Sequence, residues 1–208
     1  PETLDLPYAM SHGLKNEGAK ITAQLLETTD AMEVVNGILI PALDSAGKLF
    51  EQGKIFLPQL IQTAGVAQAA FEVIKTTLIE RNAAPVSRGE IVLATVKGDI
   101  HDIGKNIVRV LLENYGYTVL DLGRDVPCQL VADTAKEHGV KLVGLSALMT
   151  TTLGAMEETI QLVKQACPDC KVVVGGAVLT ADYAEKIGAD FYAKDAMETV
   201  AVAKEVVG

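Results

Sequence analysis

The sequence predicts an α-helical bundle followed by an α/β domain with a doubly wound, parallel sheet. Two rhythms of apolar residues carry this prediction. Up to about residue 81, apolar residues recur every three or four positions, as they do in amphipathic helices. From residue 90 onward, short runs rich in β-branched residues alternate with helical stretches. Such alternation is typical of parallel strands that helices cover on both faces.

Four helices are expected in the first part, at residues 4–14, 19–26, 32–50 and 56–79. The third is preceded by Thr29 and Asp30, either of which suits an N-cap, and Glu33 follows Asp30 at the spacing of a capping-box partner. Pro58 falls in the first turn of the fourth helix, where its missing N–H costs nothing. We therefore expect a four-helix bundle over residues 1–82.

Five strands are expected in the second part, at residues 91–96, 118–120, 141–145, 172–174 and 191–192. Helices are expected near 104–114, 127–138, 152–166, 179–187 and 196–206. The short polar segment 83–89 reads as a linker, which places the α/β domain at 90–208. A flavodoxin-like strand order, 2-1-3-4-5, would make the first, third and fourth strands neighbours.

Composition and charge exclude several classes of protein. The chain has 208 residues, of which 49% are hydrophobic and 22% charged, so it can bury enough surface to fold. Its net charge of −9 is spread over both parts and leaves no basic stripe for nucleic acid. Three cysteines make no disulfide framework, no signal peptide opens the chain, and the least charged stretch, 139–156, contains Lys141. We expect a cytoplasmic protein that neither enters a membrane nor binds nucleic acid.

Polar and glycine-rich loops follow three of the predicted strands. The first strand is followed by Asp99, His101 and Asp102, the third by Ser146 and the threonines 150–152, and the fourth by two glycines. Ligands of open α/β sheets bind beyond the carboxyl ends of the strands, near the point where strand order reverses. With the expected strand order these loops meet at one edge. The first loop holds only two glycines, so it lacks a dinucleotide fingerprint.

His101 is the candidate metal ligand in this loop cluster. Imidazole is the commonest metal ligand in proteins, and a ligating histidine usually donates its other N–H to a carboxylate. Asp99 or Asp102 could accept that hydrogen bond. No histidine or cysteine nearby in the sequence completes a zinc tetrahedron. We therefore expect a metal that brings most of its own ligands, as in a macrocyclic cofactor.

Three motifs and their spacings carry a family resemblance. Asp99-x-His101-x-x-Gly104 is followed after 41 residues by Ser146-x-Leu148, and after a further 26 by Gly175-Gly176. This pattern resembles the signature of cobalamin-binding domains that hold the cofactor base-off and His-on. Residues 49–60 resemble the helical cap that precedes this domain in methyl-transferring corrinoid proteins. The whole chain is most similar, in this comparison of motifs, to the cobalamin-binding module of methionine synthase.

The resemblance implies a role for each matching residue. His101 would be the cobalt ligand, Asp99 its hydrogen-bonded carboxylate, and Thr152 the hydroxyl that completes a proton relay. Methionine synthases generally carry serine at the position of Thr152, which leaves the relay's geometry open. The cap would contribute Phe50, Leu57 and Val66, with Ala67 where methionine is common. The complete implied cofactor-binding set is Phe50, Leu57, Val66, Gly98, Asp99, Ile100, His101, Asp102, Ile103, Gly104, Ser146, Leu148, Thr150, Thr152, Gly175, Gly176 and Ala177.

The function implied first is that of a methyl-carrier module of methionine synthase, cut from a larger enzyme and inactive alone. It would move a methyl group from methyltetrahydrofolate to homocysteine through methylcobalamin, with folate and homocysteine domains and a reactivation partner. The alternative is a stand-alone corrinoid protein of a methanol, methylamine or O-demethylase system. A cobalamin-dependent regulator would need a DNA-binding motif, which the sequence lacks, and a mutase subunit normally lacks the helical cap.

Ordinary structural explanations compete with each of these roles. A lone histidine after a strand is commonly solvated, and Phe50 and Leu57, seven apart, suit the core of a bundle. Ser146 and Thr152 could end a strand and cap a helix, and the two glycines could form a tight turn. Cys167 and Cys170 have C-x-x-C spacing but follow a helix, so we expect an inert turn. We also expect structural roles for Lys105 and Asn106.

Overall fold

The computed structural model describes residues 4–81, 83 and 87–208. Two compact units are present, Pro1–Ser87 with Glu113–Gly116, and Arg88–Leu112 with Tyr117–Gly208. The first holds the N-terminal helices and the second the α/β domain. Residues 84–86 of the predicted linker at 83–89 lie outside the described residues, and the boundaries 1–82 and 90–208 stay a prediction.

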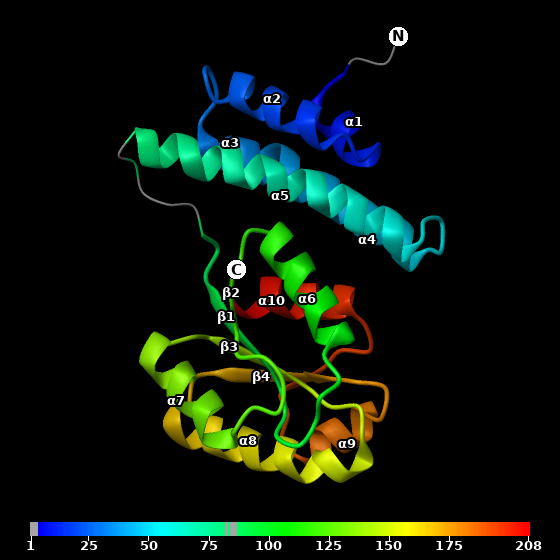
Figure 1. Ribbon diagram of the computed structural model, residues 1–208, viewed down its shortest axis with the longest axis vertical. Helices are drawn as coiled ribbons and strands as arrows, with labels where there is room; N and C mark the ends of the chain where they lie inside the picture. Colours follow the sequence, from blue (N-terminus) through cyan, green and yellow to red (C-terminus); the bar gives the residue numbers. More distant parts are fainter. Residues whose placement is uncertain (1–3, 82, 84–86) are drawn as a thin grey trace. The chain divides into compact units, whose positions relative to one another are not determined.

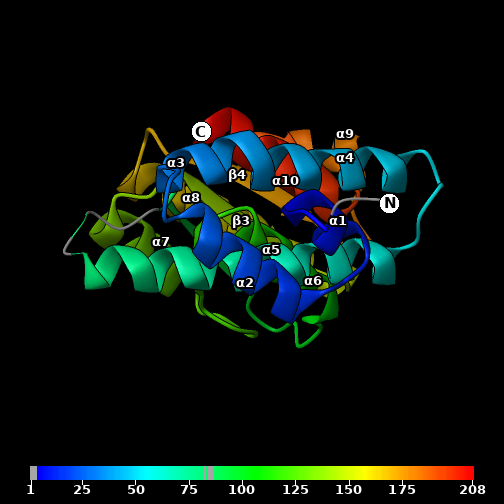
Figure 2. The same cartoon turned by 90° about the horizontal axis from the view of Figure 1, so that it is seen from above.

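The helical unit is built around one long helix. In chain order it contains α1 (Leu6–Ser11), α2 (Lys15–Leu25), α3 (Ala31–Val34), a π-helical turn η1 (Val35–Leu39), α4 (Ile40–Glu51) and α5 (Leu57–Glu80). Helix α5 packs against α1, α2 and α4 (Figure 2). Their facing sides form an apolar core that includes the fully buried residues Leu6, Met10, Leu39, Leu43, Leu60 and Ile74.

The helix predicted at 32–50 is confirmed, but it contains a wider turn. Helices α3 and α4 are continuous through η1, where the Ile40 N–H donates to the carbonyl of Val35, five residues back. Pro41 explains the turn, because it has no N–H for the carbonyl of Gly37 and its ring would clash there. Asp30 is the N-cap as predicted, since its side chain accepts a hydrogen bond of 2.9 Å from the Met32 N–H.

The second predicted helix begins earlier than expected, at Lys15 instead of residue 19. Gly18, which weakens a helix in isolation, lies inside α2. It faces α5 so closely that an added Cβ would come within 2.5 Å of Val66 Cγ1. The glycine is therefore retained by tertiary packing, which a local pattern does not reveal.

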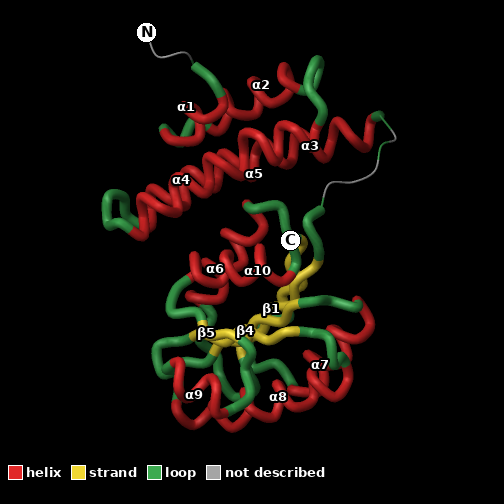
Figure 3. The backbone as a smooth tube through the Cα atoms, turned by 180° about the vertical axis from the view of Figure 1, so that it is seen from behind, coloured by secondary structure: helices red, strands yellow, loops and turns green. Residues whose placement is uncertain are grey.

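The second unit is a five-stranded parallel sheet with helices on both faces. Its strands are β1 (Glu90–Thr95), β2 (Thr118–Asp121), β3 (Leu142–Ser146), β4 (Lys171–Gly175) and β5 (Phe191–Tyr192). Its helices are α6 (Ile103–Asn114), α7 (Cys128–His138), α8 (Leu153–Ala166), α9 (Ala181–Lys186) and α10 (Ala196–Val206). Helices α6 and α10 cover one face, and α7, α8 and α9 cover the other (Figures 1 and 3).

The strand order is β2-β1-β3-β4-β5, which confirms the flavodoxin-like order. All neighbouring strands are parallel. Each strand lies within one residue of its predicted ends, because near-continuous apolar runs identify strands that are buried on both faces. Within the described residues, no helix combines the length and the apolar character needed to cross a membrane.

Candidate functional site

The strand order brings the three unusual loops together at the carboxyl edge of the sheet. Strand β3 lies between β1 and β4. The loop after β1 contacts the end of β3 through a hydrogen bond of 3.1 Å from the Val96 N–H to the Ser146 carbonyl. The loop after β3 contacts the end of β4 through a bond of 3.2 Å from the Ala147 N–H to the Gly175 carbonyl. The predicted convergence of the loops is therefore confirmed.

Asp99 is fully buried at the centre of this edge and organises two of the loops. Its Oδ1 accepts hydrogen bonds from the backbone N–H of His101 (3.0 Å) and from the ring Nδ1 of His101 (2.8 Å). Its Oδ2 accepts from the backbone N–H groups of Leu148 (2.8 Å) and Met149 (3.3 Å), and from the hydroxyl of Thr152 (2.9 Å). One carboxylate thus fixes the loop after β1 to the loop after β3.

These donors decide the charge of Asp99. Burial raises the pKa of a carboxyl group, because it disfavours the charged form. At Asp99 this effect is outweighed by the hydrogen bonds from the Leu148 and His101 backbones and from the His101 and Thr152 side chains. The pKa of Asp99 therefore lies well below its ordinary value, and the group is an ionised carboxylate at neutral pH.

The ionised Asp99 defines the tautomer of His101. A carboxylate only accepts hydrogen bonds, so the ring Nδ1 of His101 must carry the proton that it shares with Asp99. This leaves Nε2 as the ring nitrogen with a lone pair. The imidazole is 45% exposed, whereas its carboxylate partner is inaccessible to solvent. The His101 ring is thus anchored through Nδ1 to a buried carboxylate, and its role as a metal ligand stays a prediction.

Thr152, the predicted relay residue, contacts Asp99, and its role in a relay stays a prediction. Its Oγ1 lies 2.9 Å from Asp99 Oδ2 and 2.9 Å from the carbonyl of Met149. The side chain makes no cap bond to helix α8, so the helix-capping explanation does not account for it. Methionine synthases generally carry serine, which has no methyl group, at this position. The methyl group of Thr152 fits here because it lies beside Gly98, where even an added Cβ would be 3.5 Å from it.

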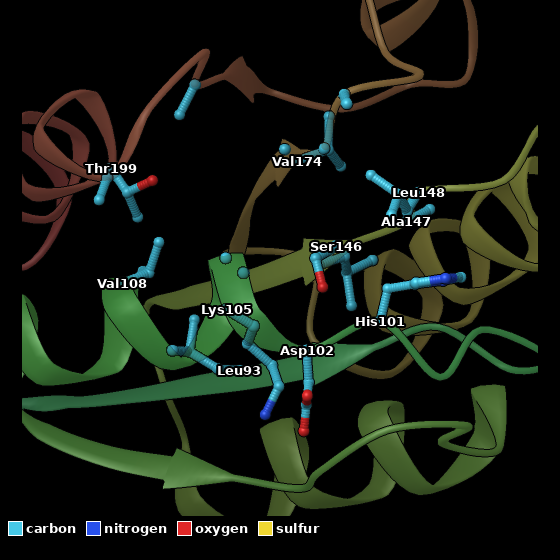
Figure 4. A pocket seen from close by; sticks show the side chains of 18 of the residues that line it. Leu93, His101, Asp102, Lys105, Val108, Ser146, Ala147, Leu148, Val174 and Thr199 are labelled. Atoms are coloured by element: carbon cyan, nitrogen blue, oxygen red, sulfur yellow. The ribbon is translucent and has the colours of Figure 1, made fainter.

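A cavity of about 730 Å³ opens beside His101. It runs between the sheet and the two helices, α6 and α10, that cover one face of the sheet. The strand register gives its floor two rows, Leu93–Gly144–Val173 and Ser146–Gly175. Val108 of α6 and Thr199 of α10 line the opposite side. Figure 4 shows His101, Ser146 and Leu148 near one end of this cavity, and Val108 and Thr199 near the other. We call this cavity the slot.

Exposed apolar side chains surround the mouth of the slot. Ile100, Ile103 and Leu148 are 58%, 79% and 43% exposed, and all three line the cavity beside His101. Large apolar side chains that gather around one polar group on a surface commonly mark a binding site. The mouth therefore presents a single imidazole within an apolar rim.

Most of the predicted cofactor-binding residues of the α/β unit line the slot. These are Ile100, His101, Asp102, Ile103, Gly104, Ser146, Leu148, Gly175, Gly176 and Ala177. Asp99 and Thr152 lie behind His101. Gly98 has a φ of +83° and donates its N–H to Asp125 Oδ1 at 2.7 Å. Thr150 is exposed at the start of the short 3-10 turn η2 (Thr150–Thr152) and does not line the slot.

The three predicted cap residues lie in the helical unit. Val66 is fully buried and faces Gly18 of α2, so it belongs to the core of the helices. Phe50 at the end of α4 and Leu57 at the start of α5 are half-buried. Their role over a cofactor stays a prediction.

Sequence reasoning missed the inner part of the slot. Leu93, Val173, Val108 and Thr199 were not among the expected residues, and apolar strand and helix positions give no local sign of a cavity. Gly144 did offer a signal, because a glycine inside a buried strand often marks a close approach. An added Cβ at Gly144 would lie 2.5 Å from Leu93 Cδ2.

Lys105 also lines the slot, although only a structural role was expected for it. It is 5% exposed, and its Nζ forms an ion pair with Asp121 at the end of β2. Arg109, one turn further along α6, donates to the other oxygen of Asp121 at 3.2 Å. Asp121 thus fastens helix α6 to the edge of the sheet at two successive turns.

Comparisons with known families agree with this geometry. A family model described as a B12 binding domain matches residues 89–201, and a second model of the same description matches residues 5–75. Dimethylamine corrinoid protein 1 of Methanosarcina acetivorans is 43% identical over 180 residues, which cover 86% of this chain and 84% of that protein. Trimethylamine corrinoid protein 1 of Methanosarcina mazei is 39% identical over 189 residues, covering 89% and 88%.

Two solved structures are similar over nearly the whole chain. A cobalamin-binding protein from Desulfitobacterium hafniense has a TM-score of 0.79 at 32% identity, covering 98% of this chain and 97% of that one. The methanol:cobalamin methyltransferase complex MtaBC from Methanosarcina barkeri contains a chain with a TM-score of 0.85 at 27% identity, covering 100% and 81%.

These relatives correct the function that the sequence motifs implied first. They are methylamine corrinoid proteins and a methanol:cobalamin methyltransferase complex, which gives no support to a methionine synthase module or to folate and homocysteine domains. The resemblance to cobalamin-binding domains is confirmed along both parts of the chain. The chain belongs to the B12-binding domain family and is a cobalamin-binding module.

Proposed function

We propose that the chain is a stand-alone corrinoid protein that carries a methyl group between methyltransferase subunits of a methylamine- or methanol-type system. The observation that carries the proposal is the Asp99–His101 pair at the mouth of the slot. The relatives support the choice of system, because methylamine corrinoid proteins match more than four fifths of the chain. In this role the chain is a carrier and depends on partner subunits for catalysis.

The residues of the slot fit cobalamin in its base-off, His-on form. The slot's volume, about 730 Å³, lies within the range of small-molecule sites. Its floor is apolar at Leu93 and Val173 and carries one hydroxyl at Ser146, which suits an aromatic base on a sugar-phosphate tail. The apolar rim suits the underside of a corrin ring. His101 would hold the cobalt, and Gly175 and Gly176 would line the tail.

The Asp99–His101–Thr152 line would control how the imidazole holds the cobalt. When bound, cobalamin supplies a cobalt centre that takes up and releases a methyl group. Asp99 orients the imidazole and raises its basicity by accepting the Nδ1–H, while Thr152 donates to the other carboxylate oxygen.

The upper face of the cofactor would be covered by the helical unit. The proposed cap residues are the half-buried Phe50 and Leu57, which Val66 would support from the core of the helices, and methylcobalamin would be the loaded form. Apolar side chains there would exclude water from the methyl group. A cap of this kind must open when a methyltransferase subunit or a reactivation partner approaches.

The axial ligand is tested by loading the protein with hydroxocobalamin, with all histidines labelled with ¹⁵N. After gel filtration and reduction to paramagnetic Co(II), we expect a visible spectrum of the base-off form and an EPR splitting from one ¹⁵N nucleus. His101→Ala is expected to lose that splitting. His138→Ala is the matched control, since His138 is a surface histidine that pairs with Glu90. A wild-type spectrum identical to free cobalamin contradicts the proposal.

The methyl donor is tested separately. Protein loaded with cobalamin is mixed with dimethylamine, trimethylamine or methanol methyltransferase subunits and their substrates, and with the folate and homocysteine domains of methionine synthase. We expect methylation of the bound corrinoid with at least one of the first group. Rates equal to those without the chain in all of these mixtures contradict the proposal.

A further inference from the structure

Thr95, the last residue of β1, lies between the slot and the His101 loop. Its side chain is fully buried. Its Oγ1 is 3.0 Å from the Ser146 hydroxyl, which lines the slot, and 3.4 Å from the carbonyl oxygen of His101. Both backbone polar groups of Thr95 are bonded to the segment after β2, because its N–H donates to the Gly123 carbonyl and its carbonyl accepts from the Val126 N–H. The backbone thus holds Thr95 where its hydroxyl can bond either to Ser146 or to the His101 carbonyl.

The two hydroxyl groups have one proton each, so their bonds depend on one another. If Ser146 donates to Thr95, the proton of Thr95 is directed to the carbonyl of His101. If Ser146 instead donates to an acceptor inside the slot, its own oxygen becomes an acceptor for Thr95. Thr95 then gives up its bond to His101, because one hydroxyl proton serves one strong hydrogen bond. What occupies the slot thus decides whether the Thr95 hydroxyl donates to the His101 carbonyl or to Ser146.

The His101 carbonyl belongs to the residue whose ring faces the mouth of the slot. Its backbone N–H and its ring are both bound to Asp99, so the Thr95 contact is a third attachment of the same residue. A nucleotide tail offers ring nitrogens and sugar and phosphate oxygens as acceptors for Ser146. Filling the slot would therefore change the attachment of the residue that carries the axial ligand.

We propose that Thr95 is a positioning residue that couples occupancy of the slot to the placement of His101. The inference rests on the proposed function, in which the tail fills the slot and His101 binds cobalt. It goes further by assigning a role to a buried threonine that does not itself line the slot. Its consequence is that a corrinoid with a tail and a corrinoid without one should bind His101 differently.

The test compares cobalamin with cobinamide, which has the corrin ring but no nucleotide tail. The variants are Thr95→Val, which keeps the shape and removes the hydroxyl, and Thr95→Ser, which keeps the hydroxyl. Thr159→Val is the matched control, because Thr159 is a buried threonine that bonds only within α8 among the contacts the structure describes. Both the affinity and the fraction of cobalt bound to ¹⁵N-histidine are measured for each corrinoid.

We expect Thr95→Val to remove the difference in histidine-bound fraction between the two corrinoids, because the Thr95–His101 bond, which the wild type would keep with cobinamide and give up with cobalamin, is then absent with both. Thr95→Ser is expected to behave like the wild type. Equal losses with both corrinoids overturn the inference, because they indicate a purely structural role. A difference that stays unchanged also overturns it.

Two further outcomes separate this inference from the function on which it rests. If wild-type protein shows no histidine signal with cobalamin, the proposed function itself fails. If Thr95→Val does not fold, Ser146→Ala removes the same hydrogen bond from its other end. We then expect a lower histidine-bound fraction with cobalamin and an unchanged one with cobinamide, and equal changes with both overturn the inference.

Discussion

Two carboxylates at neighbouring strand ends, the buried Asp99 after β1 and the half-buried Asp121 in β2, are ionised by different means. In both, burial raises the pKa and hydrogen bonds more than offset it, so both pKa values lie below the ordinary value. The donors that the structure shows at Asp99 are backbone N–H groups, a hydroxyl and the His101 ring. At Asp121 the leading donor is the ammonium group of Lys105, assisted by Gly123 and Arg109.

This difference distinguishes a carboxylate that orients a candidate ligand side chain, Asp99, from one that stabilises the fold, Asp121. The charge of Asp121 is balanced by two cations on α6, Lys105 and Arg109. Asp121 therefore fastens the helix, and its charge is not available to a third group. The charge of Asp99 is spread over neutral donors and remains available to the His101 ring. An imidazole held by such a carboxylate is a stronger metal ligand.

The largest expected effect follows from removing Asp99. Asp99→Ala leaves the backbone N–H groups of His101, Leu148 and Met149 without this acceptor, and we expect the free energy of unfolding to fall by about 3–5 kcal/mol. The His101 ring also loses its orientation, so cobalamin affinity should fall by about 10- to 100-fold. Urea unfolding and equilibrium binding measure the two effects. A variant within about 0.5 kcal/mol of the wild type would show that Asp99 does not organise the loops.

Asp121→Asn should give a smaller effect of a different kind. Lys105, which is almost fully buried, loses its counter-charge, and we expect a loss of about 1–3 kcal/mol in the free energy of unfolding. The histidine signal of the loaded protein should be unchanged. Glu90→Gln, which breaks an exposed pair with His138, is the control and should cost less than about 0.5 kcal/mol. Loss of the histidine signal in Asp121→Asn would show that Asp121 also orients the His101 ring, which contradicts the separate roles given to Asp99 and Asp121.

The smallest effect is a change in acid sensitivity. Since the folded-state pKa values of both groups are lowered, the unfolded chain binds more protons below about pH 4, and the wild type loses stability as the pH falls through that range. Between pH 5 and 7 these groups contribute a constant amount. In Asp99→Asn the slope of unfolding free energy against pH should fall by up to about 1.4 kcal/mol per pH unit below pH 4. Equal slopes in both proteins would refute the lowered pKa of Asp99.

The sequence predicted the parts of the molecule that depend on local order. The strands, their order and the Asp99–His101 pair follow from apolar runs and from residues two positions apart in one loop. It could not predict that Lys105 pairs with Asp121, because the two are 16 positions apart and meet only when β2 lies at the sheet edge. The inner slot was missed for a related reason. Leu93 and Val173 look like core residues until α6 and α10 leave space above them.

Two glycines of the recognised motifs have different genetic consequences. Gly176 has a φ of +138°, and any Cβ there would lie 1.8 Å from the Ala147 carbonyl oxygen, whereas a Cβ on Gly104 meets nothing within 4 Å. Every missense change at codon 176 therefore damages the apoprotein itself and should be visible as reduced protein abundance. A change at codon 104 should leave protein abundance unchanged. Its effect should be detected only when growth depends on the protein with its cofactor bound.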